Sequence, residues 1–365
     1  MKKKHYKWLI FALCGIALFA SGATARSSAV SEREVVTGLA IDAVDDGGVE
    51  VTAEVISPDN MGGRQVATVT AKSATVAGAL SDICRTTGKK AVLTHCDMIL
   101  LGAGIIRRDA FGALDHLIRN AYVSENAMLA TTDGRASDLL SATVDFAETP
   151  ALYAKRMLVS YAQHKGVTRR TVKDFMITHL TPFASNRLAV IKKTDTEEEK
   201  SVFTLGETAV FSADGRYLLT LSEAQSEGLD YFLGTVKKGD IATTGDGGES
   251  INLEIINKNC GRAYDLATRA VTLDVTLTLA VREIYGGGRL TAYGSSLSKT
   301  ETDRIRSGVA VAVADAFEAC KAQGADVFDL YGGFFRRYGR VWRDTAGVDY
   351  LQTLRLNVNV KLILR

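Results

Sequence analysis

The sequence predicts an α+β fold with several domains, built mainly of antiparallel sheets with helices packed on them. Apolar and polar residues alternate at 271–282 and again at 352–364, which is typical of strands with one solvated face. Between them, 301–322 has the apolar stripe of a helix. Successive strands with helices to one side favour α+β over alternating βαβ units. At 365 residues and 46% hydrophobic composition, the chain allows two or three domains with their own cores.

The first 25 residues are expected to be an export signal. A basic start precedes an apolar run at 8–20 and a small-residue site, and we expect cleavage after Ala25. The run is shorter than the roughly 20 residues of a spanning helix. Cys14 is a candidate lipidation site, although Leu13 stands where a lipoprotein signal has a small residue. The signal contains four of the 44 basic residues, so 44 − 4 = 40 basic residues remain against 42 acidic ones. This balance gives no reason to expect a polyanionic partner.

The next part of the chain, 26–200, is predicted to be an N-terminal α+β domain. It opens with a meander of three strands, in which a Gly-rich turn at 45–48 joins the first two. A helix from 73, a strand at 91–101 and a helix around 111–118 follow. The expected strands of the meander are 36–42, 49–55 and 65–71, and the expected later helices are 151–163 and 170–180.

Two loops are expected to divide the remainder. The charged run at 192–200 cannot contribute to a core and is predicted to be a loop or linker. A hairpin at 208–221 then leads to a short helix that Ser222 and Gln225 cap and that ends near Gly234. A Gly-rich loop at 243–248 closes this part. The sequence therefore predicts a small middle domain at 201–248 and a C-terminal α+β domain at 249–365.

The C-terminal domain gives the sharpest structural prediction. The strands at 271–282 and 352–364 are expected in one antiparallel sheet, covered by the helix at 301–322, because neither apolar face can stay exposed. Ser298 and Glu301 form a capping box at the start of that helix. Its predicted core stripe is Ile305, Val309, Ala312, Ala316 and Cys320.

Four cysteines follow the signal, and an even number in an exported chain allows two disulfides. Cys84 and Cys320 lie on the apolar faces of predicted helices, which favours buried thiols; the pairing stays open. No Cys or His spacing suits zinc, so no metal is expected.

We expect no enzyme activity and no cofactor, because no nucleophile, phosphate-loop or metal-hydrolase motif occurs. His95 and Cys96 are adjacent in a predicted strand and would point to opposite faces, so His95 would not activate the thiol.

The stretch 334–343 interleaves aromatic residues with four arginines and is the candidate interaction segment. Packing of the aromatics with solvated arginines is the favoured interpretation. The alternative is contact with an anionic membrane surface or a membrane partner, for which the candidate residues are Phe335, Arg336, Arg340 and Trp342. Nucleic acid is not expected, because the chain is exported and its charge is balanced.

Several stretches, in this order, resemble the GerAC-type family, the lipoprotein C subunits of bacterial spore germinant receptors. They are REVVTGLAID at 33–42, LTHCDMILL at 93–101, GETAVF at 206–211, QGADVF at 323–328 and Trp342. The resemblance covers nearly the whole chain after the signal.

The resemblance implies three α+β domains on the outer face of the inner spore membrane. It implies a complex with two integral membrane subunits, a need for this subunit in the response to nutrients, and no enzymatic activity. The alternatives are an exported solute-binding protein, which would have two βαβ lobes around a cleft, and a cell-wall-modifying hydrolase, which would need a carboxylate pair or a metal site.

Overall fold

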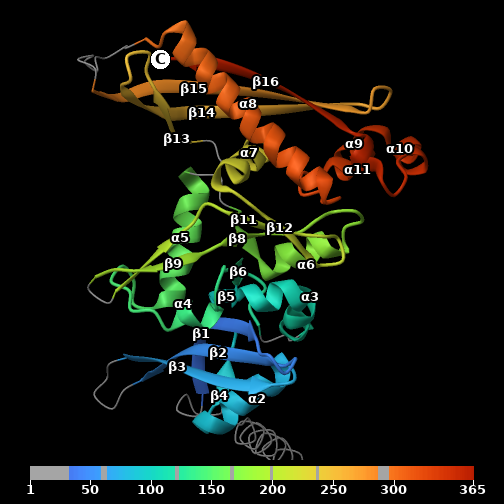
Figure 1. The fold of residues 1–365 in the computed structure, drawn as a ribbon. Coiled ribbons are helices and arrows are strands. Elements are labelled where there is room, and N and C mark those ends of the chain that lie inside the picture. The colour runs from blue at the N-terminus through green and yellow to red at the C-terminus, as the bar shows by residue number, and fades with distance from the viewer. Residues whose placement is uncertain are drawn as a thin grey trace, which may run out of the picture.

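The computed structural model describes residues 33–58, 64–119, 123–164, 168–197, 200–235, 238–286 and 296–365. The predicted α+β fold with several domains is confirmed. Figure 1 shows the N-terminal strands at one end of the molecule, the C-terminal sheet with its long helix at the other, and α7 (Glu223–Leu233) between them. The chain folds into a ten-stranded, a two-stranded and a four-stranded sheet within the described residues.

The ten-stranded sheet is mixed, with the order β12-β11-β8-β6-β5-β1-β2-β3, while β4 pairs with β1 and β7 with β6. Both ends are antiparallel, and the central strands β1, β5, β6 and β8 run parallel. All residues of β5 are buried, as expected for a strand covered on both faces. The strands are β1 Arg33–Ala43, β2 Val49–Pro58, β3 Arg64–Ser73, β4 Lys90–Val92, β5 Met98–Leu101, β6 Met128–Thr131, β7 Arg170–Thr171, β8 Arg187–Val190, β11 Thr208–Phe211 and β12 Tyr217–Leu221.

The predicted strand at 91–101 is wrong in one respect, because it is split into β4 and β5. Both strands pair with β1 in parallel, at Arg33 to Val35 and at Gly38 to Ile41 respectively. β1 has two residues between these pairings and its partner has five, at 93–97. The longer segment therefore leaves the sheet as a turn, closed by the hydrogen bond from the Cys96 amide to the Leu93 carbonyl (3.0 Å).

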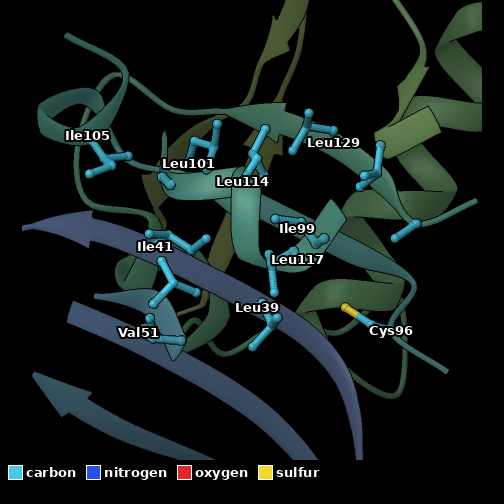
Figure 2. Close-up of a cluster of buried hydrophobic side chains, with 14 of the residues drawn as sticks. Leu39, Ile41, Val51, Cys96, Ile99, Leu101, Ile105, Leu114, Leu117 and Leu129 are labelled. Carbon is cyan, nitrogen blue, oxygen red and sulfur yellow. The ribbon is translucent and has the colours of Figure 1, made fainter. Parts of the chain in front are cut away.

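Helices pack on this sheet through the apolar faces that the sequence predicts. Figure 2 shows Leu117 of α3 near Ile99 of β5 and Leu39 of β1, and Leu114 of the same helix near Leu101 of β5. Phe111 and Ile118 of the same helix pack at the edge of this core and are partly buried. The helices of this half are α2 Val76–Thr87, α3 Ala103–Arg119, α4 Ala136–Leu140, α5 Pro150–His164 and α6 Val172–Leu180.

Two buried carboxylates on the sheet cap the helices above it. Asp42 of β1 accepts hydrogen bonds from the amides of Ala136 (2.8 Å) and Ser137 (2.9 Å) at the start of α4. Glu54 of β2 accepts one from the Ala151 amide (3.1 Å) at the start of α5. The first amides of a helix have no partner within it, so these side chains satisfy donors that burial would leave unpaired.

The charged run at 192–200 is not simply a loop. β9 (Lys192–Asp195) and β10 (Ser201–Thr204) form an antiparallel hairpin, and Phe203 is buried in the core beneath it. Charged side chains are compatible with a strand here because most of β9 is exposed. The predicted hairpin of β11 and β12 is confirmed, and it joins the large sheet through β8. Strands from both sides of residue 200 thus share one sheet, and the division into 26–200, 201–248 and 249–365 stays a prediction.

The four-stranded sheet contains β13 (Gly239–Thr244), β14 (Ser250–Asp265), β15 (Ala270–Tyr285) and β16 (Arg355–Leu364), in this order. β15 and β16 therefore lie in one sheet, as predicted, but they pair in parallel. The antiparallel expectation is wrong because alternation reports only that one face is solvated. The long connection between the two strands carries helices across the sheet and returns the chain in the same direction, as parallel pairing requires.

The helix α8 (Lys299–Ala322) covers the apolar face of this sheet (Figure 1). The predicted capping box is present, with Ser298 and Glu301 each bonding the other's amide at 3.0 and 2.8 Å. Four of the five predicted stripe residues are buried, whereas Ala312 is half-buried. The stripe also contains Val313 and Phe317.

The helix α7 connects the two large sheets. Its predicted capping box of Ser222 and Gln225 and its predicted end near Gly234 are confirmed, and Gly234 adopts the left-handed conformation. A Cβ on Gly228 would lie 2.0 Å from the carbonyl oxygen of Ala312 in α8, so only glycine permits this close crossing of the two helices. Val210 and Leu221 of the large sheet belong to the same apolar core as the four-stranded sheet. The two halves therefore share packed side chains.

The four described cysteines are free thiols. Cys96 and Cys320 are buried, and burial raises the pKa of each to about 12. At about pH 8, only about one in ten thousand of such thiols is ionised, and the thiolate is the reactive form.

We expect Cys96 and Cys320 to resist a thiol reagent in the folded chain that starts at Arg26, and all four cysteines to react after denaturation. Mass spectrometry of the peptides would identify the labelled positions. The half-buried Cys84 and Cys260 serve as internal comparison. Rapid native labelling of Cys96 or Cys320 would contradict this burial.

Candidate interaction surface

The candidate segment 334–343 spans two short helices. α9 (Leu330–Tyr338) and α10 (Arg340–Thr345) meet at Gly339, which has φ 57° and ψ −127°. Figure 1 shows both helices, with α11 (Tyr350–Thr353), grouped at one end of α8. The break at Gly339 turns the chain, so residues that are close in sequence face different surroundings on the two helices.

A buried carboxylate holds this helical group together. Asp326 accepts hydrogen bonds from the amides of Leu330 (2.9 Å) and Tyr331 (2.8 Å) and from the hydroxyl of Tyr350 (2.6 Å). Burial raises the pKa of Asp326, and these three hydrogen bonds partly offset that rise. Asp326 therefore fixes the start of α9 and ties it to α11, which positions the exposed residues farther along α9.

The aromatic residues of the segment divide into a buried and an exposed set. Trp342 is fully buried: its ring stacks on Phe334 at 4.4 Å between centroids and meets the edge of Tyr350 at 5.8 Å. The alternative that Trp342 contacts a membrane or partner is therefore wrong, because its whole side chain lies in the core. Phe334 is also buried. For these two residues, the core-packing interpretation is confirmed.

Phe335, Arg336 and Arg340 are exposed, as the contact hypothesis requires, and Phe335 retains 44% of its accessible surface. We call their surroundings the α9–α10 surface, which consists of Phe335, Arg336, Arg337, Arg340, Val341 and Arg343, all exposed. The sequence indicates the arginines but gives no signal that Val341 is exposed. Its exposure results from the turn at Gly339, which leaves Trp342 facing the core and its neighbour facing outward.

The charge of this surface is only partly balanced. Arg336 pairs with Asp329 at 2.7 Å, and Arg343 with Asp344 at 3.1 Å. In the part of the chain that the structure describes, Arg337 and Arg340 have no ion-pair partner. Exposed pairs of this kind contribute little energy, so all four guanidinium groups are available to an anionic surface.

Other candidate chemistry is not assembled by the fold. His95 lies exposed in the turn between β4 and β5, whereas the Cys96 thiol is buried. The described residues contain no group of three His, Cys, Asp or Glu side chains that could hold a metal. None of the helices in the described ranges is long and apolar enough to span a membrane. Cys14, the candidate lipidation site, lies outside the described residues.

Comparison with known proteins agrees with the resemblance seen in the sequence. The family model described as "Spore germination protein N-terminal domain" matches residues 27–193, and "Spore germination B3/ GerAC like, C-terminal" matches 206–365. No curated protein sequence matches the chain.

The fold is similar to that of a solved structure, "Crystal Structure of the GerBC protein", with a TM-score of 0.53 and 17% identity over 90% of this chain and 96% of that one. Since the two family matches together span nearly the whole chain after residue 26, the protein belongs to the GerAC-type family of spore germinant receptor C subunits.

Proposed function

We propose that this chain is the non-enzymatic C subunit of a spore germinant receptor, required for the response of spores to nutrients. The observation that carries the proposal is the match of both family domains in their order along one chain. In this proposal the chain is exported, lies on the outer face of the inner spore membrane, and assembles with two integral membrane subunits. After cleavage at Ala25 its partners would hold it there, whereas lipidation at Cys14 would give it a lipid anchor of its own.

Deletion of the gene from the parent spore former tests this role. We expect the mutant spores to lose germination triggered by the nutrient that the receptor recognises and to keep germination by triggers that bypass nutrient receptors. Restoring the gene should restore the response. Co-purification with two membrane subunits from spore membranes is expected in addition. A normal nutrient response of the mutant in every nutrient mixture that triggers the parent would refute the proposal, as would cleavage of peptidoglycan by the purified chain.

The α9–α10 surface is the face that we propose meets the anionic membrane. It combines the exposed apolar side chains of Phe335 and Val341 with four arginines. Apolar area and basic charge together favour binding at a membrane surface, because one inserts at the interface while the other attracts anionic headgroups. Each basic residue near such a surface contributes about 1 kcal/mol.

Replacing Arg336 and Arg340 together with Ser should weaken binding to vesicles that contain phosphatidylserine by roughly 30-fold at low salt. Vesicle flotation measures this binding. The control replaces Arg85 and Arg119 with Ser, which removes the same charge from α2 and α3 in the N-terminal half of the molecule. Equal binding of the Arg336/Arg340 variant and the unchanged protein, at low and moderate salt, would remove this surface from the proposal.

A further inference from the structure

A cavity of about 380 Å³ lies where the large sheet meets α7. Its walls come from β7 and β8 on one side and from α7 on the other. Both polar and apolar side chains line it, including Thr168, Arg170, Arg187, Ser226, Leu229 and Asp230. Its volume suits a small molecule, since ligand cavities typically have about 300–1,000 Å³.

Two arginines in this cavity have hydrogen-bond donors without acceptors. The Nε atoms of Arg170 and Arg187 are buried and have no hydrogen-bond partner within the described residues. One terminal nitrogen of Arg187 donates to the Val327 carbonyl at 3.0 Å, which fixes the guanidinium in place. Buried donors nearly always have an acceptor in folded proteins. Two such Nε donors without one, on the same cavity wall, indicate that a bound ligand supplies the acceptor.

The charges around the cavity also favour an anionic ligand. Burial is the main cause that lowers the pKa of Arg187 to about 9, and the neighbouring charge of Arg170 is the second. Burial also lowers the pKa of Arg170. Asp230 on the α7 wall offsets part of this positive charge, but its carboxylate is held by Lys258 at 2.5 Å. Asp174 near Arg170 and Asp329 near Arg187 supply further negative charge, yet the pKa of both arginines is still lowered, so the two buried positive charges are only partly compensated.

We propose that this cavity binds a small oxyanion, a carboxylate or a phosphate, through Arg170 and Arg187. The flat, forked guanidinium group matches both anions and can donate two parallel hydrogen bonds to either. The anion would supply acceptors for the unpaired Nε donors and neutralise the two adjacent charges, while Leu229 would contact a short carbon chain. This site is independent of the proposed receptor role and of the α9–α10 surface.

Ligand-induced stabilisation tests the site in the chain that starts at Arg26. Melting temperatures are measured with increasing sodium phosphate and, separately, sodium succinate, each against sodium chloride at equal ionic strength. A ligand that binds only the folded state raises the melting temperature in a saturable way. We expect at least one of the two anions to do so. Phosphate alone would identify a phosphate site, and succinate alone a carboxylate site.

Arg170→Gln and Arg187→Gln should each weaken the fitted affinity by roughly 10- to 100-fold, the range for lost hydrogen bonds to a charged group. The control Arg216→Gln removes an exposed arginine that pairs with Asp214 in the turn between β11 and β12 and does not line the cavity, so it should leave the affinity unchanged. If Arg187→Gln does not fold, Arg170→Gln alone tests the site. The Arg170 Nε has no hydrogen-bond partner in the described part of the protein that this substitution would remove. No saturable shift with either anion, or equal shifts in all three variants, would overturn the proposal.

Discussion

Replacing Lys258 with Met is expected to lower the free energy of unfolding by about 3–5 kcal/mol. Lys258 of β14 and Asp230 of α7 form an ion pair at 2.5 Å, with side chains only 4% and 5% exposed. The ammonium group also lies 4.6 Å from the ring centre of Tyr231. Methionine fills much of the same volume but leaves the Asp230 carboxylate buried without its cation, which is the costly half of breaking such a pair.

The unfolding free energies of Lys258→Met and of two further variants are compared by denaturant unfolding. Arg282→Met breaks the exposed pair with Glu254 on the same sheet and should cost much less, because water solvates both charges. The double variant Lys258→Met/Asp230→Leu removes both buried charges and should recover much of the stability lost in the single variant. If Lys258→Met costs no more than Arg282→Met, the pair is not buried in solution.

Val309→Asp is expected to destabilise the C-terminal part of the chain by about 4 kcal/mol or more. Val309 is 5% exposed and lies on the face of α8 that packs against the four-stranded sheet. An aspartate there would place an unpaired charge among apolar side chains or force the helix away from the sheet.

Val311→Asp is the matched control, two residues along the same helix. Val311 is 52% exposed, so the same substitution keeps its charge in water and should change stability only slightly. Helix propensity changes equally in both variants, so the difference between them reports burial alone. Equal midpoints in urea for the two variants would mean that α8 does not cover the sheet as described.

Local patterns in the sequence were sufficient where neighbours along the chain make the contacts. The capping boxes at Ser222 and Ser298, the left-handed helix end at Gly234 and the hairpin of β11 and β12 depend on residues a few positions apart. Alternation likewise predicted the strands β15 and β16, since it records which face meets the core.

The direction and continuity of strands were decided by tertiary structure. β16 runs parallel to β15 because of the path taken by the helices between them, and that path leaves no trace in the alternation of either strand. β4 and β5 are separate strands because five residues lie between their pairings with β1, whereas β1 has only two there. β1 is distant from them in sequence. Both outcomes are set by long-range pairing, whereas a sequence pattern reports only the surroundings of each residue.

The sequence by itself determined the family, the α+β class and the arginine-rich segment, three of whose four candidate residues are exposed. Only the tertiary structure decided that Trp342 is core, since the turn at Gly339 directs its ring onto Phe334. Only the tertiary structure brought Arg170 and Arg187 into one cavity, with α7 as the opposite wall. A side chain's surroundings depend on elements far away in the chain, and their packing rather than local periodicity determines whether it becomes core, surface or site.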